Sequence, residues 1–293
     1  MRWMCVLALV ACAGEPEEVD PRRDGTTWPT EVTAEGRTAK VVTPSTYDGV
    51  SDLPLIIVLH GYGASGPVQD AYFQISNRVT EGGFVALVPD GTTDLTGKQF
   101  WNATDVCCDF ANTGVDDVAY LTGLIDAVEA TIPIDPDRIV LVGHSNGGFM
   151  SYRMACDVSD RIAGIASLAG ANFSEAEDCA ASATVSVLQI HGTDDDTVEY
   201  GGGALPVGDG RYPGAVESAA YWADLAGCGD LVDDGRVDYA RNLDGDDTSR
   251  QVWADCTDAN VALWSIDGGG HIPVFTDAFQ ADLLDWLLAQ RRP

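Results

Sequence analysis

The chain has 293 residues, and 45% of them are apolar, which is normal for a globular protein with a sizeable core. Its charge is unusual, because 46 acidic residues against 16 basic ones give a net charge of −30. Such a surface repels nucleic acids and anionic lipid headgroups, so we expect no nucleic-acid partner, and it suits a salty medium that screens self-repulsion.

The chain begins with the composition of a targeting segment. One arginine precedes an apolar run over residues 3–11, which is too short to span a membrane and is typical of a signal-peptide core. Residues 9–12 read Leu-Val-Ala-Cys and resemble the lipobox of bacterial lipoproteins, so Cys12 is predicted to carry a lipid anchor. Cleavage after Ala13, which would release a soluble secreted protein, is the alternative.

These features divide the chain into three parts. We expect a signal peptide with its lipobox at residues 1–12, a charged, flexible tether at 13–26 and one folded domain at 27–293. The protein is then secreted or lipid-anchored to the bacterial cell envelope, in the periplasm, in the outer membrane or at the cell surface. We expect a monomer.

Strand and helix patterns alternate along the domain. The first half is predicted to form an edge hairpin, a strand, a helix, a strand, a long loop and an N-capped helix. In chain order these are residues 31–42, 53–59, 68–80, 84–88, 91–114 and 116–131.

The second half of the domain is predicted to form a strand and helix, two strands, a helix, a hairpin turning at Gly245, a strand and a closing helix. In chain order these are residues 138–142, 148–155, 162–168, 185–190, 212–226, 237–253, 261–266 and 275–290. The alternation favours an α/β fold with one mainly parallel central sheet and helices on both faces.

Six cysteines lie outside the targeting segment, and an even number in an exported domain predicts disulfides. They are Cys107, Cys108, Cys156, Cys179, Cys228 and Cys256. Cys228 and Cys256 flank a segment rich in turn residues and are expected to pair. A direct bond between Cys107 and Cys108 would be strained, so each is expected to reach Cys156 or Cys179, in an order that stays open. No cysteine has the spacing of a zinc site.

One stretch carries a chemical motif. Residues 143–147 read Gly-His-Ser-Asn-Gly, a G-x-S-x-G pentapeptide between a predicted strand and a predicted helix. That context predicts a nucleophile elbow, in which the glycines let strand and helix approach and the hydroxyl of Ser145 is lifted above the sheet. The N–H of Asn146, at the helix N-terminus, is predicted to stabilise an oxyanion in the same space. An ordinary Gly/Ser turn is the alternative.

A serine nucleophile needs a base, which is usually a histidine, and the chain has only four. His144 adjoins the serine and is expected to point elsewhere, while His60 is expected to brace the glycine-rich loop that follows the first core strand. His191 ends another core strand. His271 follows three glycines between the last strand and the last helix, a loop that can carry an imidazole to the carboxyl edge of the sheet, and it is the predicted base.

The acid that orients the base is expected after another strand on the same edge. Residues 194–196 are three consecutive aspartates, which gives the order Ser, Asp, His expected of α/β-hydrolases. Such an acid holds the imidazole tautomer and stabilises the imidazolium. Each aspartate could instead be an ordinary turn residue, and its chemistry alone does not show which of the three is the catalytic acid.

Together these motifs resemble the poly(3-hydroxybutyrate) depolymerase and feruloyl esterase branch of the α/β-hydrolases, from about Leu53 to the last helix. The matching residues are His60-Gly61-Tyr62-Gly63, Trp101 with Cys107-Cys108, residues 115–118, 143–148 and 191–200, and Gly268-Gly269-Gly270-His271. The resemblance implies an α/β-hydrolase fold, places the catalytic acid on Asp195 and supports the Cys228–Cys256 pair. The family often has Trp-Pro-Gly after the histidine, whereas this chain has Ile272-Pro-Val, so the acyl group is not implied.

The loop His60-Gly61-Tyr62 also resembles the oxyanion loop of polyester hydrolases. This implies that Tyr62 donates its N–H to the oxyanion and offers its ring to the substrate, and it makes a polyester substrate conceivable, even an aromatic one such as a terephthalate. The predicted substrate contacts are Tyr62, Trp101, His144 and Ile272, and core packing is the alternative for the aromatic rings.

The sequence therefore predicts a serine carboxylesterase that hydrolyses aryl or polymer-linked esters through Ser145, His271, Asp195 and an acyl-enzyme. No cofactor or metal is expected, although the Asp-rich turn at residues 242–247 leaves Ca²⁺ binding open. The alternatives are a serine peptidase with the same triad and a non-catalytic binding lipoprotein.

Overall fold

The structure is a computed structural model that describes residues 27–205 and 210–293. The signal peptide, lipobox and tether predicted for residues 1–26 lie outside the described residues. Within the described ranges, no helix is long and apolar enough to cross a membrane.

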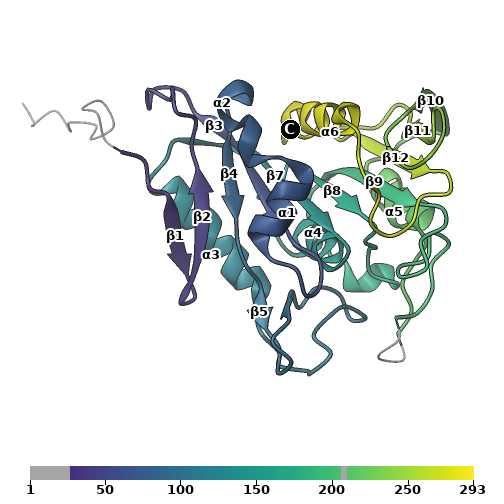
Figure 1. Cartoon of the computed structure of the whole chain (residues 1–293), viewed down its shortest axis with the longest axis horizontal. Coiled ribbons are helices and arrows are strands. Elements are labelled where there is room, and N and C mark those ends of the chain that lie inside the picture. The colour runs from purple at the N-terminus through teal and green to yellow at the C-terminus, as the bar shows by residue number, and fades with distance from the viewer. Residues whose placement is uncertain (1–26, 206–209) are drawn as a thin grey trace, which may run out of the picture.

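The described residues fold around one large twisted sheet with helices on both faces (Figure 1). Its strands are β1 Glu31–Ala34, β2 Arg37–Val42, β3 Leu53–Leu59, β4 Val85–Val88, β7 Ile134–His144, β8 Gly164–Leu168, β9 Ser186–Gly192, β10 Leu231–Val237, β11 Thr248–Trp253 and β12 Val261–Ile266. They lie in the order β1-β2-β4-β3-β7-β8-β9-β12-β11-β10. A separate two-stranded ladder, β5 Thr92–Thr93 with β6 Gln99–Phe100, lies in the loop predicted at 91–114.

The centre of the sheet is parallel, and antiparallel hairpins form its two edges. Strands β4, β3, β7, β8, β9 and β12 pair in parallel, whereas β1–β2 and β10–β11 are antiparallel. Strand β3 is buried along its whole length, and its successive side chains enter two different cores, because side chains alternate between the faces of a strand. The carboxyl ends of the parallel strands therefore meet at one edge.

Among the described residues, three of the longer helices cover one face of the sheet and two cover the other. Helices α3 Asp117–Glu129, α4 Asn146–Asp157 and α5 Ala215–Leu225 pack into one core, and α1 Gly66–Phe73 and α6 Asp277–Ala289 pack into the other. Shorter helical turns lie at η2 Ser76–Arg78, α2 Val79–Gly82 and η3 Ala176–Asp178. This is the α/β architecture that the sequence predicts.

Two predicted elements differ from the structure. The helix expected at 68–80 is broken after α1, because Gln74 has a left-handed backbone with φ 58° and the carboxylate of Asp70 accepts the N–H of Ser76 (2.8 Å). The hairpin expected at 237–253 has its first strand at β10, before the predicted start. Strand β10 is half-buried only at its ends and exposed between them, so it lacks the apolar alternation by which strands are recognised.

The disulfides also correct one expectation. Cys228 pairs with Cys256, as the sequence predicts, but Cys107 pairs with Cys108 across a cis peptide bond rather than with Cys156 or Cys179. The reason is the position of Cys156, whose Cα lies 4.8 Å from that of Cys179, within the usual range for a disulfide. These two bond to each other, which leaves the two adjacent cysteines as partners.

Candidate active site

Ser145 occupies a sharp turn between β7 and α4. Its backbone has φ 54° and ψ −120°, and its N–H donates to the carbonyl of Leu168 (2.8 Å). The turn needs the two flanking glycines, because a Cβ on Gly143 would lie 2.1 Å from the Gly147 oxygen, and one on Gly147 would lie 2.2 Å from the oxygen of Leu59. The strand–turn–helix context that makes the pentapeptide a nucleophile elbow is therefore present, and Ser145 is half-buried.

Asn146 fixes the start of α4 against the long loop. Its side-chain amide accepts the N–H of Trp101 (2.8 Å) and donates to the Trp101 carbonyl (2.9 Å). The backbone N–H of Asn146 belongs to the first turn of α4, where no earlier helical carbonyl is available to accept it. In the part of the chain that the structure describes, this N–H has no protein acceptor.

The loop that carries Tyr62 lies against the elbow. A Cβ on Gly61 would lie 3.5 Å from the Cβ of Ser145, and the loop is fixed by the Gly63 N–H, which donates to the Gln99 carbonyl (2.8 Å). Among the described residues, the N–H of Tyr62 also has no protein acceptor. The Tyr62 hydroxyl donates to Asp94 (2.6 Å), and this hydrogen bond raises the pKa of the phenol. The geometry leaves two N–H groups unpaired beside Ser145.

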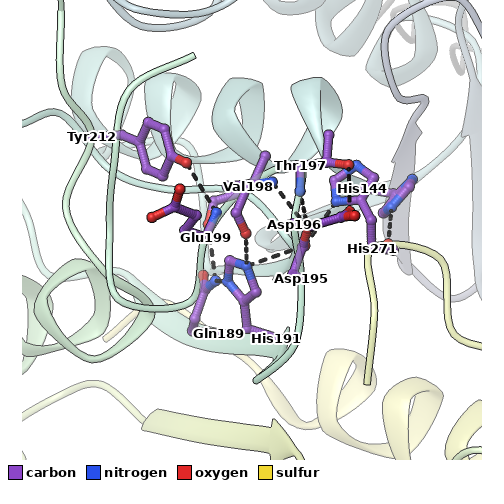
Figure 2. A network of polar contacts seen from close by, with 11 residues as sticks. His144, Gln189, His191, Asp195, Asp196, Thr197, Val198, Glu199, Tyr212 and His271 are labelled. Atoms are coloured by element: carbon purple, nitrogen blue, oxygen red, sulfur yellow. Dashed lines mark hydrogen bonds and ion pairs between the residues drawn. The ribbon is translucent and has the colours of Figure 1, made fainter. Parts of the chain in front are cut away.

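His271 and Asp195 form a direct pair (Figure 2). The Nδ1 of His271 lies 2.8 Å from Oδ2 of Asp195, and the other carboxylate oxygen accepts the N–H groups of Thr197 and Val198, each at 2.9 Å. Burial alone would raise the pKa of Asp195, but the hydrogen bonds from His191 and His271 outweigh it and hold the pKa well below its usual range. The carboxylate is therefore charged, which is the state that orients a histidine base.

The loops that carry the pair are packed together. The N–H of Asp194 donates to the Gly269 carbonyl (2.9 Å), and the N–H of Gly268 donates to the Thr193 hydroxyl (2.8 Å). A Cβ on Gly192 would lie 2.1 Å from the Gly269 oxygen, so glycine is needed at this crossing. Among the three consecutive aspartates, Asp195 alone is buried, while its two neighbours are exposed.

His144 and Tyr72 hold the base loop from the other side. The Nε2 of His144 lies 2.9 Å from the His271 carbonyl, and the Tyr72 hydroxyl, on α1, donates to the Pro273 carbonyl (2.7 Å). Burial, with the nearby charge of His271, lowers the pKa of His144 to about 4, so this imidazole is neutral and its Nε2 donates. His60 braces the oxyanion loop, because its Nδ1 donates to the Gly61 carbonyl (2.9 Å) while its Nε2 accepts the N–H of Gly91 (2.9 Å).

Within 27–205 and 210–293, the hydroxyl of Ser145 makes no side-chain hydrogen bond, and the bonded ring nitrogens of His144 and His271 contact the His271 carbonyl and Asp195 instead. A bond between the serine hydroxyl and the base is often long before substrate binds and shortens only in the substrate complex. The structure therefore pairs the predicted acid with the predicted base and bonds the base loop to His144, the residue before Ser145.

Two predicted substrate contacts are not supported. Trp101 is fully buried, its indole N–H donates to the His60 carbonyl (3.0 Å), and its ring stacks on Tyr120, so its prediction as a substrate contact is wrong. His144 is buried and bonded to the base loop, so the same correction applies to it. The rings of Trp101 and His144 lie in the protein interior and do not line a cleft. Tyr62 is half-buried and Ile272 is 66% exposed, so both remain available to a substrate.

The sequence did not reveal the parts of two side chains near the site, Tyr72 and His191. Tyr72 lies on a helix with no motif around it, and no local signal links it to a loop 200 residues away. His191 is buried beside Asp195, with its Nε2 3.4 Å from Oδ2 of the carboxylate. Its position four residues before the acid was a signal that could have indicated the contact.

One cavity adjoins the loop of Tyr62. It has a volume of about 250 Å³ and is lined by Tyr62, Leu95 and Phe110, whose ring meets that of Tyr62 edge-on at 5.4 Å. A larger cavity of about 670 Å³, beside Trp253 and Trp286, is lined by no residue of the elbow, the oxyanion loop or the Asp195–His271 pair. The smaller cavity shares Tyr62 with the oxyanion loop.

The fold and the site together define an α/β-hydrolase. Residues 48–206, more than half of the chain, match the phospholipase/carboxylesterase family, and the chain belongs to this family. The fold class predicted from the sequence is thereby confirmed.

Individual relatives are esterases. The chain is 28% identical over 235 residues to feruloyl esterase B of Piromyces equi. The aligned region covers 78% of this chain and 41% of that protein. It is 32% identical over 128 residues to a poly(3-hydroxybutyrate) depolymerase of Ralstonia pickettii. This aligned region covers 40% of this chain and 25% of that protein. It therefore spans less than half the length of these two relatives. An acetyl xylan esterase from Aspergillus awamori, 14% identical, shares the fold with a TM-score of 0.62 over 88% of this chain and 97% of that one.

Proposed function

We propose that this chain is a serine carboxylesterase of the feruloyl esterase type that acts through a Ser145–His271–Asp195 triad. The observation that carries the proposal is the 2.8 Å contact between His271 and a buried, charged Asp195. The loop of His271 is bonded in turn to His144, the residue before Ser145. Charge on the acid holds the base in the tautomer whose Nε2 can accept a proton from serine.

The residues then take the following parts. The oxygen of Ser145 attacks the ester carbonyl carbon while His271 accepts its proton, and the carbonyl oxygen becomes an oxyanion. The unpaired N–H groups of Tyr62 and Asn146 stabilise that charge. When the intermediate collapses, the carbon–oxygen bond to the alcohol breaks and His271 delivers the proton to the leaving oxygen. Water repeats the sequence on the acyl-enzyme and restores Ser145.

The cavity beside the oxyanion loop supports an ester with one aromatic or apolar group next to the carbonyl. Its walls combine the apolar side chains of Tyr62, Leu95 and Phe110 with the carboxylates of Asp94 and Asp109. Its volume of about 250 Å³ is just below the usual range for a whole ligand, so it suits one ring-sized group. Feruloyl esters, and polyesters with an aromatic or hydroxyalkanoate unit, meet this description.

We also propose that the protein is exported. The disulfides at Cys156–Cys179 and Cys228–Cys256 support an oxidising compartment. The predicted signal peptide at 1–12, the tether at 13–26 and a lipid on Cys12 complete the proposal, in which the catalytic domain at 27–293 is secreted or held at the cell envelope as a monomer.

A panel of substrates tests the function. We expect purified protein to hydrolyse methyl ferulate, and to act more slowly on acetylated xylan, hydroxybutyrate oligomers and terephthalate esters, while the Ser145→Ala variant is inactive on all of them. Hydrolysis of peptides without hydrolysis of esters would replace the proposal with a serine peptidase. Tight binding of an ester by folded protein with no turnover would replace it with a binding lipoprotein.

A further inference from the structure

A second histidine touches the carboxylate that orients His271. His191, at the end of β9, is buried, and its Nε2 lies 3.4 Å from Oδ2 of Asp195 and 2.7 Å from the carbonyl of Val198 (Figure 2). Oδ2 is the oxygen that also faces His271. The buried imidazole has no place in the reaction steps above, yet it shares the acid with the base.

The neighbours of His191 fix where its proton lies. The carbonyl of Gly170 can only accept, so the side-chain nitrogen of Gln189, 2.9 Å away, must donate to it. The same nitrogen lies 3.0 Å from Nδ1 of His191, which therefore accepts. The imidazole carries its proton on Nε2 and points it at the Val198 carbonyl and the Asp195 carboxylate.

The orientation of Gln189 is itself held. The hydroxyl of Tyr152, on α4, donates to the side-chain oxygen of Gln189 (2.9 Å), and both side chains are fully buried. A chain of hydrogen bonds thus runs from α4 through Gln189 and His191 to Asp195. Buried chains of this kind stay in one arrangement, because any flip leaves a polar atom without a partner.

We propose that His191 is a positioning residue that holds Asp195 in the orientation needed to pair with His271, and that Gln189 sets its tautomer. His191 contacts the turn at residues 195–198 at both ends, because its Nε2 lies 3.4 Å from Oδ2 of Asp195 and donates to the Val198 carbonyl, while the Val198 N–H donates to Oδ1 of Asp195 (2.9 Å). The carboxylate can then rotate only by breaking these bonds. The inference rests on the proposed triad.

The first test compares two substitutions at one position. In His191→Leu the donor is lost, and we expect kcat on methyl ferulate to fall by about 10- to 100-fold, the loss typical of one hydrogen bond to a charged group, with KM nearly unchanged. In His191→Gln the side-chain nitrogen replaces Nε2 as a donor, and we expect kcat within about threefold of wild type. Equal kcat for His191→Leu and wild type would overturn the proposal.

The pH profile separates positioning from a general loss of structure. The groups that face the site are Asp195, His271, His144 and the ring of Tyr200, 5.7 Å from that of His191. Without His191, Asp195 is no longer held in the orientation that pairs with His271, so the carboxylate favours the imidazolium less. The acid limb of kcat/KM should therefore move to lower pH in His191→Leu and stay in place in His191→Gln. A lower rate with an unmoved limb in His191→Leu would indicate a structural role only.

A double-mutant cycle tests the part assigned to Gln189. We expect Gln189→Met to lower kcat in the wild-type background and to have no further effect in His191→Leu, because Gln189 acts through His191. Additive losses would contradict this. Should His191→Leu fail to fold, long-range ¹H–¹⁵N spectra of the wild-type protein decide, since they must show His191 protonated on Nε2 alone at neutral pH, and protonation on Nδ1 would overturn the proposal.

Failure of this inference can be told from failure of the proposed function. If Ser145→Ala is inactive and His191→Leu is fully active, the triad stands and His191 has no positioning role. If Ser145→Ala keeps its activity, the proposed function itself is wrong.

Discussion

Asp195 differs from its two neighbours in burial and in hydrogen bonding, not in chemistry. Three consecutive aspartates have the same pattern, so the residues alone could not choose among them, and only the resemblance to a family favoured Asp195. The structure separates them, because Asp195 is buried with both oxygens hydrogen-bonded while Asp194 and Asp196 are exposed. The contact between an aspartate of this turn and His271 was predictable, whereas the burial of Trp101 was not, since a ring in a loop can face the core or the solvent.

We therefore expect Asp195→Asn, of the three single substitutions to asparagine, to be the one that loses esterase activity. An amide removes the charge that stabilises the imidazolium and offers an N–H where His271 needs an acceptor, so kcat should fall by about 10⁴-fold, as in other triads. Asp194→Asn and Asp196→Asn are the matched controls and should keep near-normal rates. Steady-state kinetics on methyl ferulate measure all three, and a crippled Asp194→Asn or Asp196→Asn beside an active Asp195→Asn would refute the assignment.

The pH dependence of kcat/KM should show one acid limb between about pH 5 and 8. A base must be neutral to accept the proton of Ser145, and a histidine is the side chain that ordinarily titrates in this range. Asp195 stays charged throughout, because its pKa is held low, and the limb cannot come from His144, whose pKa is lowered to about 4. Activity should thus be lost as pH falls, with a plateau on the alkaline side.

The control is His191→Gln, which should keep the limb. A limb erased by this substitution, or near-normal turnover in His271→Ala, would show that His271 is not the base.

At the scale of elements, strands buried on both faces were the easiest to predict. The runs at 53–59 and 261–266 match β3 and β12 residue for residue, because a continuous apolar stretch between turn residues has few alternatives. Strand β10 was missed since it is a mostly exposed edge strand with polar side chains. The break after α1 was missed because Gln74 takes a left-handed conformation without a glycine to signal it.

The connection between β10 and β11 depends on one buried carboxylate. Asp247 accepts the N–H groups of Tyr239 (3.2 Å) and Ala240 (2.9 Å) and the hydroxyl of Thr248 (2.6 Å). Its oxygens are thus used within the protein, so this carboxylate has a structural part in the turn at residues 242–247.

We expect Asp247→Ala to lower the free energy of unfolding by about 2–4 kcal/mol, because it leaves two buried N–H groups without acceptors. Urea denaturation measures this, and Asp244→Ala, at an exposed position of the same turn, is the control, with a change within about 0.5 kcal/mol. Equal stability of the two variants would mean that the turn is held by other contacts.

At the scale of the whole molecule, the net charge of −30 opposes the compact state. The ion pairs cannot offset much of it, since pairs such as Arg241–Asp277, with side chains 55% and 86% exposed, contribute little. Salt screens the long-range repulsion, with a Debye length of about 3 Å at 1 M.

Added NaCl should therefore stabilise the protein. We expect the midpoint of thermal unfolding to rise by several degrees between low salt and 1 M NaCl, most steeply at the lower concentrations, where screening changes fastest. An uncharged osmolyte at matched concentration is the control for general exclusion effects. A midpoint that is constant or falls with NaCl would show that self-repulsion does not limit stability.

The acid limb of kcat/KM should also move to lower pH between low salt and 1 M NaCl, because salt screens the negative charge that favours the imidazolium.

The central claim is that Ser145 forms the acyl-enzyme, and covalent labelling tests it most directly. Wild-type protein treated with a fluorophosphonate should gain the mass of one label, lose its esterase activity in proportion, and carry the label on the peptide that contains Ser145. Ser145→Ala should take up no label. A label on another residue, or ester hydrolysis that survives full labelling of Ser145, would contradict the account.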